Sequence, residues 1–186
     1  SFFSLATRIT EAHQGIVYEL RADAMLAVWP LDQPDPLSAQ STNRGGSPAD
    51  RRQAAKAQQA AEALHHQLQP LLDHPLPDPL EPLGLGIGIA AGKVTEGTLG
   101  TSGRRTQMLM GETVTLAIRL QSMTGELAYP ILCEAGFTQL LEPRSTQNLG
   151  RYLLEGLTSP RTVYAPSTPM TDSVVTPLRP RVKQGA

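Results

Sequence analysis

The sequence has few of the features that would cross-link this chain, embed it in a membrane or attract it to nucleic acid. Its one cysteine, Cys133, cannot form a disulfide within the chain. No apolar run approaches the roughly 20 residues that span a bilayer, and the N-terminus lacks the basic region and cleavage site of a signal peptide. A net charge of -1 gives no electrostatic basis for non-specific nucleic-acid binding. We therefore expect a soluble, cytoplasmic domain without nucleic-acid or membrane contacts, within a parent protein that could itself be membrane-anchored.

Aromatic residues make up only 4% of the chain, whereas 40% of it is hydrophobic. The core must therefore consist of aliphatic side chains, alanine and methionine. With 186 residues, the chain fits one domain with loose segments. Cys133 lies in the apolar run 129–134, which predicts a buried strand residue rather than a reactive thiol.

Three histidines, His65, His66 and His74, raise the question of a metal site. Adjacent histidines on a helix point about 100° apart. No cysteine stands nearby, and we identify no complete ligand set around these histidines, so we expect no metal there.

Hydrophobic periodicity predicts a mixed α+β domain. Helices are expected at 2–13, stopped by Gly15, at 50–72, capped by Asp50, at 112–123, ended by Gly125, and at 135–141. On the third helix, the expected inward residues are Val114, Ala117, Ile118 and Leu120. Strands are expected at 16–20, 25–29, 94–99, 107–110, 131–133, 152–154 and 162–164.

Segments rich in proline and polar residues predict the limits of the domain. Residues 30–49 are expected to form an exposed insertion, and 73–82 a connector. Beyond 165 the sequence loses periodicity, so 166–186 are predicted to be a disordered tail or linker after a domain at 1–165.

The segment 84–93 has glycine at every second position of its first half. This pattern predicts a central strand that another backbone or a ligand approaches closely. It does not fit a dinucleotide-binding fingerprint, whose glycines lie between a strand and a helix.

Three segments in order resemble the catalytic domains of class III nucleotide cyclases. They are HQGIVYELRADAMLAVW at 13–29, GIGIAAGKVTEGTLG at 86–100 and MGETVTLAIRLQSMTG at 110–125, followed by the closing GLTSPRTVY at 156–164. The resemblance covers residues 1–165. It implies a ferredoxin-like α+β sandwich, lacking the family's first strand in this chain, that dimerises head to tail with nucleotide sites at the interface.

The reaction of this family explains its metal requirement. A ribose 3′-hydroxyl attacks the α-phosphate of ATP or GTP and expels pyrophosphate, and two ions of Mg²⁺ or Mn²⁺ hold the attacking and leaving oxygens. Asp23 matches the family's second metal-binding aspartate. A hairpin turn could also place an aspartate there without function. The first metal aspartate belongs to the strand that would precede residue 1.

Two further positions match residues that act on the phosphate and the ribose. Arg119 matches the arginine that stabilises charge on the transferred phosphate, although it could equally be a solvated or salt-bridged helix residue. Thr115 stands where the family usually has an asparagine that holds the ribose, and its hydroxyl has a shorter reach.

Base selection depends on Glu19 and Met108. At the position of Glu19 a carboxylate can accept hydrogen bonds from guanine, but Glu19 could also be an ordinary surface residue of a strand. Met108 offers only apolar contact and a weak acceptor, so the pair matches neither base specificity. Leu157 replaces a phosphate-binding lysine of some members, and Ala22 and Ala24 replace glycines at the metal turn.

The resemblance implies a nucleotide cyclase domain that forms cyclic AMP or cyclic GMP in intracellular signalling, paired with an identical or different cyclase domain. The altered site residues favour a second hypothesis, a catalytically silent homology domain that dimerises and regulates. A ferredoxin-like binding module of another family is a third, which the motif at 110–125 disfavours.

Overall fold

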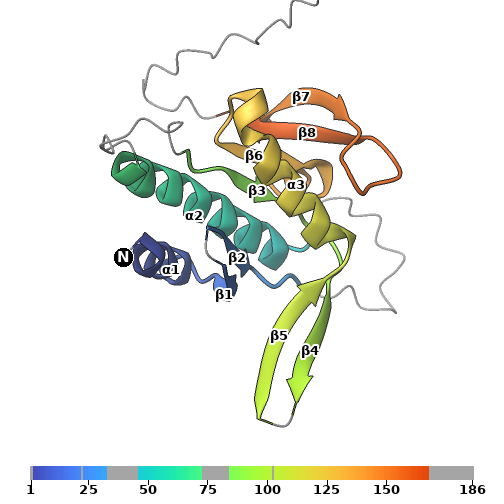
Figure 1. Ribbon diagram of the computed structural model, residues 1–186. Coiled ribbons are helices and arrows are strands. Elements are labelled where there is room, and N and C mark those ends of the chain that lie inside the picture. The colour runs from blue at the N-terminus through green and yellow to red at the C-terminus, as the bar shows by residue number, and fades with distance from the viewer. Residues whose placement is uncertain (1, 22, 33–45, 73–83, 102, 168–186) are drawn as a thin grey trace, which may run out of the picture.

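The structure is a computed structural model that describes residues 2–21, 23–32, 46–72, 84–101 and 103–167 (Figure 1). Most of the predicted insertion, connector and tail lie outside these residues. So do Ala22 and His74.

The chain forms an α+β domain, as predicted. Its helices are α1 (Phe2–Ala12), α2 (Pro48–Leu72), α3 (Glu112–Leu127) and α4 (Ala135–Thr138). Its strands are β1 (Ile16–Leu20), β2 (Met25–Val28), β3 (Ile87–Ile89), β4 (Thr95–Thr101), β5 (Arg104–Met110), β6 (Ile131–Glu134), β7 (Thr146–Tyr152) and β8 (Arg161–Pro166).

The strands form one larger sheet and two hairpins. The sheet has the order β3-β6-β8-β7, in which β3 and β6 are parallel and the other pairs antiparallel. β1 pairs with β2, and β4 pairs with β5. The β4–β5 hairpin extends away from the rest of the molecule (Figure 1).

Aliphatic side chains fill the core, as the composition predicts. One buried cluster lies between α3 and the larger sheet and includes Leu116, Leu120, Leu132 and Val163. A second joins α2 to β6 and α4 through Ala54, Cys133 and Phe137, and a third joins α1 to α2. Burial, helped by the Glu134 charge, raises the pKa of the Cys133 thiol to about 12, which fits the prediction of an unreactive strand cysteine.

The glycines of the 84–93 segment let α3 lie directly on β3. A Cβ atom on Gly88 would stand 2.1 Å from the carbonyl oxygen of Ala117, and one on Gly86 would stand 2.1 Å from Thr124 Oγ1. The predicted close approach is therefore made by the backbone of α3, which fixes how the helix sits on the sheet.

The ends of the first two helices differ from the prediction. α1 ends at Ala12, and the chain turns at Gln14, whose φ is 61°. Gly15 is buried against the Trp29 ring, which leaves no room for a side chain because a Cβ there would lie 2.5 Å from a ring carbon. α2 begins before Asp50. Ser47 caps it, since its hydroxyl accepts from the Asp50 N–H while Asp50 Oδ2 accepts from the Ser47 N–H.

The prediction for α3 was wrong in two respects. The helix continues through Gly125 to Leu127, because the left-handed residue that ends it is Ala128, with φ 57°. Ile118 does not face inward and is 50% exposed. The buried residues of this helix are Leu116, Leu120 and Thr124, one per turn on the side that faces the sheet.

The last elements are also displaced from their predicted positions. β7 ends at Tyr152, because the chain turns there into a loop in which Leu153 is exposed and Leu154 buried. α4 ends at Thr138 and is shorter than predicted. Its start is fixed by Glu134, whose carboxylate accepts hydrogen bonds from the N–H groups of Gly136 and Phe137.

Candidate functional site

Thr115 and Arg119 lie one turn apart on α3, so their side chains share a face of the helix. The loop between β7 and β8 covers this face. Arg119 Nε donates a hydrogen bond to the carbonyl oxygen of Glu155 at 2.9 Å, and Arg119 Nη1 lies 3.1 Å from Glu155 Oε2. A Cβ built on Gly156 would be 4.0 Å from Thr115 Cγ2, and the Thr115 hydroxyl donates to the Gly111 carbonyl at 3.3 Å.

The core holds the β7–β8 loop in place on both sides of Glu155. Leu154 is 5% exposed, and Leu157 packs, half-buried, against the same cluster. The Leu157 N–H donates a hydrogen bond to the Leu154 carbonyl at 3.0 Å. Gly156 takes a φ of 84°, which favours glycine. Leu157 therefore packs against the core, at the position that the sequence resemblance matches to a phosphate-binding lysine.

A second ion pair joins α3 to the end of this loop. Arg161, the first residue of β8, pairs with Glu112, the first residue of α3. The loop is thus tied to the helix at two places, by Glu155 and by Arg161.

The two predicted base-selecting residues lie on strands that contact each other. Glu19 is on β1 and Met108 on β5, where Met108 pairs with Gly97 of β4. Both side chains are half-buried. Glu19 Oε1 accepts a hydrogen bond from Arg21 Nε at 2.7 Å, and this bond is the main reason why the pKa of Arg21 is raised. The carboxylate of Glu19 is therefore already paired.

Tyr18 links β1 to the projecting hairpin. It is the extra residue of a bulge in β1, and its hydroxyl donates to Glu96 Oε1 of β4 at 3.1 Å. This hydrogen bond raises the pKa of the Tyr18 hydroxyl. The bond helps to hold β4 and β5, and hence Met108, beside β1.

Asp23 stands exposed in the turn between β1 and β2. The turn is closed by a hydrogen bond from the Arg21 N–H to the Ala24 carbonyl at 2.8 Å. In the described ranges, no three or more histidine, cysteine, aspartate or glutamate side chains gather closely enough to hold a metal ion. Asp23 is therefore not part of a cluster of three or more such ligands among the described residues.

The predicted site residues thus lie in two separate groups. Thr115 and Arg119 share the α3 face, while Glu19 and Met108 lie on neighbouring strands; no hydrogen bond or ion pair among the described residues joins Asp23 to α3. Sequence reasoning missed Glu155, the partner of Arg119. Its position directly before the GLTSPRTVY segment was the available signal.

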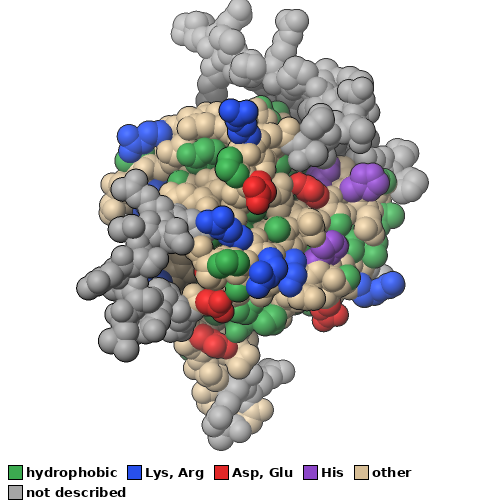
Figure 2. Space-filling view, turned by 180° about the vertical axis from the view of Figure 1, so that it is seen from behind, with side chains coloured by type: hydrophobic (Ala, Val, Ile, Leu, Met, Phe, Trp, Pro, Cys, Tyr) green, Lys and Arg blue, Asp and Glu red, His purple; other side chains and the backbone are tan. Residues whose placement is uncertain are grey.

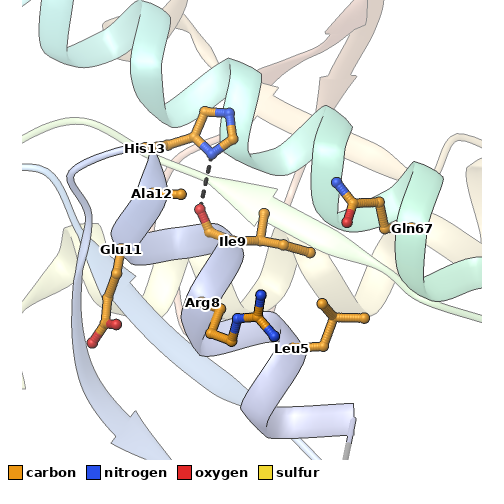
Figure 3. A pocket seen from close by; sticks show the side chains of 7 residues that line it. All are labelled: Leu5, Arg8, Ile9, Glu11, Ala12, His13 and Gln67. Atoms are coloured by element: carbon orange, nitrogen blue, oxygen red, sulfur yellow. Dashed lines mark hydrogen bonds between the residues drawn. The ribbon is translucent and has the colours of Figure 1, made fainter.

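Other surfaces of the molecule are distinct from these groups. On the face in Figure 2, basic and acidic side chains are interspersed rather than gathered by sign. A shallow hollow on α1 and α2 contains no residue of α3, β5 or the β7–β8 loop (Figure 3). It is lined by Leu5, Arg8, Ile9, Glu11, Ala12, His13 and Gln67. None of the helices in the described part of the chain is both long and apolar enough to cross a membrane.

Comparisons with known proteins give matches to solved structures. No protein-family model matches the sequence, and no curated protein matches it. A bacterial light-regulated adenylyl cyclase matches 89% of this chain with a TM-score of 0.63 and 26% identity. The match covers 43% of that cyclase, so this chain spans less than half its length.

Two other cyclases match over most of their own length. The adenylyl cyclase CyaB from P. aeruginosa has a TM-score of 0.67 and 19% identity, over 89% of this chain and 78% of that one. The guanylate cyclase domain of RhGC from Catenaria anguillulae, in complex with GTP, has a TM-score of 0.61 and 20% identity, over 89% and 80%. These matches show that the chain has the fold of the catalytic domains of class III adenylyl and guanylyl cyclases, to which its sequence segments are also similar.

Proposed function

We propose that this domain binds ATP or GTP and forms cyclic AMP or cyclic GMP in intracellular signalling. The observation that carries the proposal is the placement of Arg119 one turn from Thr115 on the α3 face, beside the anchored β7–β8 loop. Solved neighbours of this fold include a guanylate cyclase domain with GTP and a rhodopsin-guanylyl cyclase core of converted specificity with ATPαS.

In this proposal Arg119 binds the phosphate under attack. Its guanidinium keeps its charge at all physiological pH values and presents several donors in a fixed plane. Such donors stabilise the negative charge that develops on the phosphate in the transition state. Thr115 contributes a hydroxyl toward the ribose, after release of its bond to the Gly111 carbonyl.

Glu19 and Met108 form the base end of the proposed site. The Glu19 carboxylate can accept hydrogen bonds from the N1 and N2 groups of guanine once it leaves Arg21. Met108 contributes apolar contact. Glu19 thus favours GTP, whereas Met108 favours neither base.

We propose that the partner is a second cyclase domain, either identical or different. Large apolar side chains stand exposed on the projecting hairpin and on α3: Leu99 is 67%, Ile118 50% and Met110 45% exposed. Exposed apolar side chains of this size fit a protein partner better than water. One solved neighbour is described as a non-canonical dimeric guanylyl cyclase domain.

In this proposal Asp23 holds Mg²⁺ or Mn²⁺ together with a second carboxylate that another segment supplies. The sheet edges indicate where it would enter. Among the described strands, β2 pairs only with β1 and β3 only with β6. Met25 and Ile87 pack on the α1–α2 cluster, while Trp29 and Ile89 pack on the next one, so β2 and β3 run in the same direction.

A strand placed between these two edges and antiparallel to both would end at the start of β2, beside Asp23. The family resemblance assigns the first metal aspartate to a strand that precedes α1. We propose that such a strand fills this position in the full-length protein and completes the metal site.

The alternative, a catalytically silent cyclase homology domain, is supported by a specific observation. Both charged residues proposed to contact the nucleotide are paired within the chain, Glu19 with Arg21 and Arg119 with Glu155. A silent domain would still dimerise and would regulate an active partner.

The two functions are separated by incubating the full-length protein with Mn²⁺ and either ATP or GTP and measuring cyclic product. We expect cyclic AMP or cyclic GMP to accumulate. A correctly folded protein that yields neither product contradicts the catalytic proposal. A change in the turnover of an added active cyclase domain would then support the regulatory one.

A further inference from the structure

We propose that Glu155 competes with the nucleotide phosphates for Arg119 and thereby weakens nucleotide binding. This inference rests on the proposed function, because it assigns Arg119 to the phosphates. It concerns Glu155, which none of the sequence motifs included.

A single residue, Glu155, contacts Arg119 through both its backbone carbonyl and its side-chain carboxylate. Glu155 receives Arg119 Nε on its backbone carbonyl at 2.9 Å and places Oε2 3.1 Å from Arg119 Nη1. The carboxylate thus occupies donors and cancels charge on the group that a phosphate would use. A phosphate that uses the Nη1 donors must displace the carboxylate, and one that binds at Nη2 lies close to its negative charge.

The loop leaves the carboxylate close to any phosphate that replaces it. Leu154 and Leu157, on either side, are held by the core, and Gly156 fixes the turn between them. The Glu155 side chain can rotate into water, since it is 83% exposed, but its backbone stays opposite Arg119. Its negative charge therefore continues to repel a polyphosphate after displacement.

A positioning role for the carboxylate is the opposite interpretation. The backbone carbonyl of Glu155 already orients Arg119 through Nε, and this bond does not depend on the side chain. Removal of the carboxylate charge should therefore free Arg119 without disorienting it. The two roles predict opposite signs: competition predicts that its removal strengthens phosphate binding, and positioning predicts that it weakens binding.

The test is Glu155→Gln in the full-length protein, with Glu142→Gln as a control that removes the same charge from an exposed glutamate in the segment after α4. Binding of inorganic tripolyphosphate, ATP and GTP is measured by titration calorimetry. We expect Glu155→Gln to bind tripolyphosphate about tenfold more tightly than the wild type. Glu142→Gln should bind like the wild type.

A second experiment repeats the Glu155→Gln measurement in the Arg119→Ala background. If Glu155 acts through Arg119, Glu155→Gln should give a much smaller gain in the Arg119→Ala background than in the wild type. A gain of the same size in both backgrounds would show only a general charge effect and would overturn the inference. So would equal or weaker binding by Glu155→Gln, including the case in which neither protein binds tripolyphosphate.

The measurement is independent of turnover. Tighter binding by Glu155→Gln with no cyclic product from either protein would support the competition and contradict the catalytic proposal. Cyclic product from the wild type, with no tighter binding by Glu155→Gln, would support the catalytic proposal and contradict the competition.

Discussion

The α3 face and the turn between β1 and β2 both carry predicted site residues, but they are built in different ways. On α3, Arg119 is held by two contacts from a loop whose flanking leucines are in the core. In the turn, Asp23 is exposed, and the one ion pair nearby joins Glu19 to Arg21. The helix itself lies on a glycine-rich strand that admits no added Cβ at Gly88.

This difference shows that Arg119 and Asp23 depend on different groups for their positions. The packed β7–β8 loop holds Arg119 through Glu155 before any ligand arrives, so in the proposed site the phosphate-binding residue is already placed. Asp23 has no such contacts from the core, and in the proposed site its carboxylate would be fixed by a metal ion and a second carboxylate. The α3 face should therefore tolerate changes in ligand conditions but be sensitive to packing, and the turn should show the opposite behaviour.

The largest expected effect comes from breaking the packed side. Gly88→Ala would place a Cβ 2.1 Å from the Ala117 carbonyl oxygen and 2.5 Å from the Gln121 nitrogen, both backbone atoms of α3. We expect the free energy of unfolding, measured with urea, to fall by about 3 kcal/mol as the helix is forced off the strand. Gly125→Ala is the matched control.

A Cβ at Gly125 would meet no atom within 4 Å, and the residue lies inside α3. Gly125→Ala should therefore stabilise the domain by about 0.5–1 kcal/mol through helix propensity. If the two alanine variants had equal stability, the α3 face would not owe its position to the glycine strand.

Much of the fold could be predicted from periodicity, because each helix and strand buries a regular set of side chains. The errors occur where local signals compete with packing. Gly125 looks like a helix end, yet α3 continues to Leu127 and is capped by the left-handed Ala128, because the turn that follows must return the chain to the buried strand β6. Ile118 looks like a core residue, yet it is exposed because Leu116 and Leu120 define the face on the sheet.

The site was less predictable, since its contacts join segments that are distant in the sequence. The family segments place Thr115 and Arg119 on one helix, and the helical period then places them on one face. Neither the period nor the segments indicate that Glu155, 36 residues further on, contacts Arg119. Such a pair depends on the path of the β7–β8 loop, which is set by tertiary packing.

The next largest effect concerns turnover. Arg119→Ala and Asp23→Ala should each reduce the formation of cyclic product in the full-length protein at least about a hundredfold, because each removes transition-state stabilisation. Initial rates with Mn²⁺ and either ATP or GTP test this. Arg151→Ala, at an exposed position of β7, is the control and should retain its rate.

Binding measurements distinguish the reason for the lost turnover in Arg119→Ala from that in Asp23→Ala. Arg119→Ala should weaken tripolyphosphate binding even without metal, whereas Asp23→Ala should act only when Mn²⁺ is present. Full activity in both variants would refute the site assignment. An effect of Asp23→Ala without metal would contradict the proposed dependence of the turn on the ion.

The buried carboxylate of Asp50 should contribute more to stability than the exposed charges of the β1–β2 turn. Asp50 is 8% exposed, and its carboxylate accepts from the N–H groups of Asp32 and Ser47, which lie on opposite sides of the segment 33–45. Asp50→Asn turns an acceptor into a donor facing one of these N–H groups. We expect a loss of about 1–2 kcal/mol in the free energy of unfolding.

The pH dependence of Asp50 follows from the same contacts. Burial raises its pKa, but the hydrogen bonds from Ser47 and Asp32 outweigh burial, so the pKa is lowered overall. The stabilisation is therefore present above the unfolded pKa of about 3.9 and is lost as the pH falls through the lower folded value. Stability curves of the wild type and Asp50→Asn should converge in that acidic range; parallel curves down to the lowest pH would contradict this role.

The smallest expected effect is in the exposed turn. In the Arg21–Glu19 pair the side chains are 66% and 37% exposed, so the attraction is screened by water and offset by lost side-chain freedom. Arg21→Gln should unfold at nearly the same urea concentration as the wild type, measured side by side. The same variant frees the Glu19 carboxylate, so any gain in GTP over ATP binding would come without a stability cost. A loss of stability as large as that of Gly88→Ala would mean that the turn is held as firmly as the α3 face, and Asp23 would then be positioned by the fold rather than by the proposed metal ion.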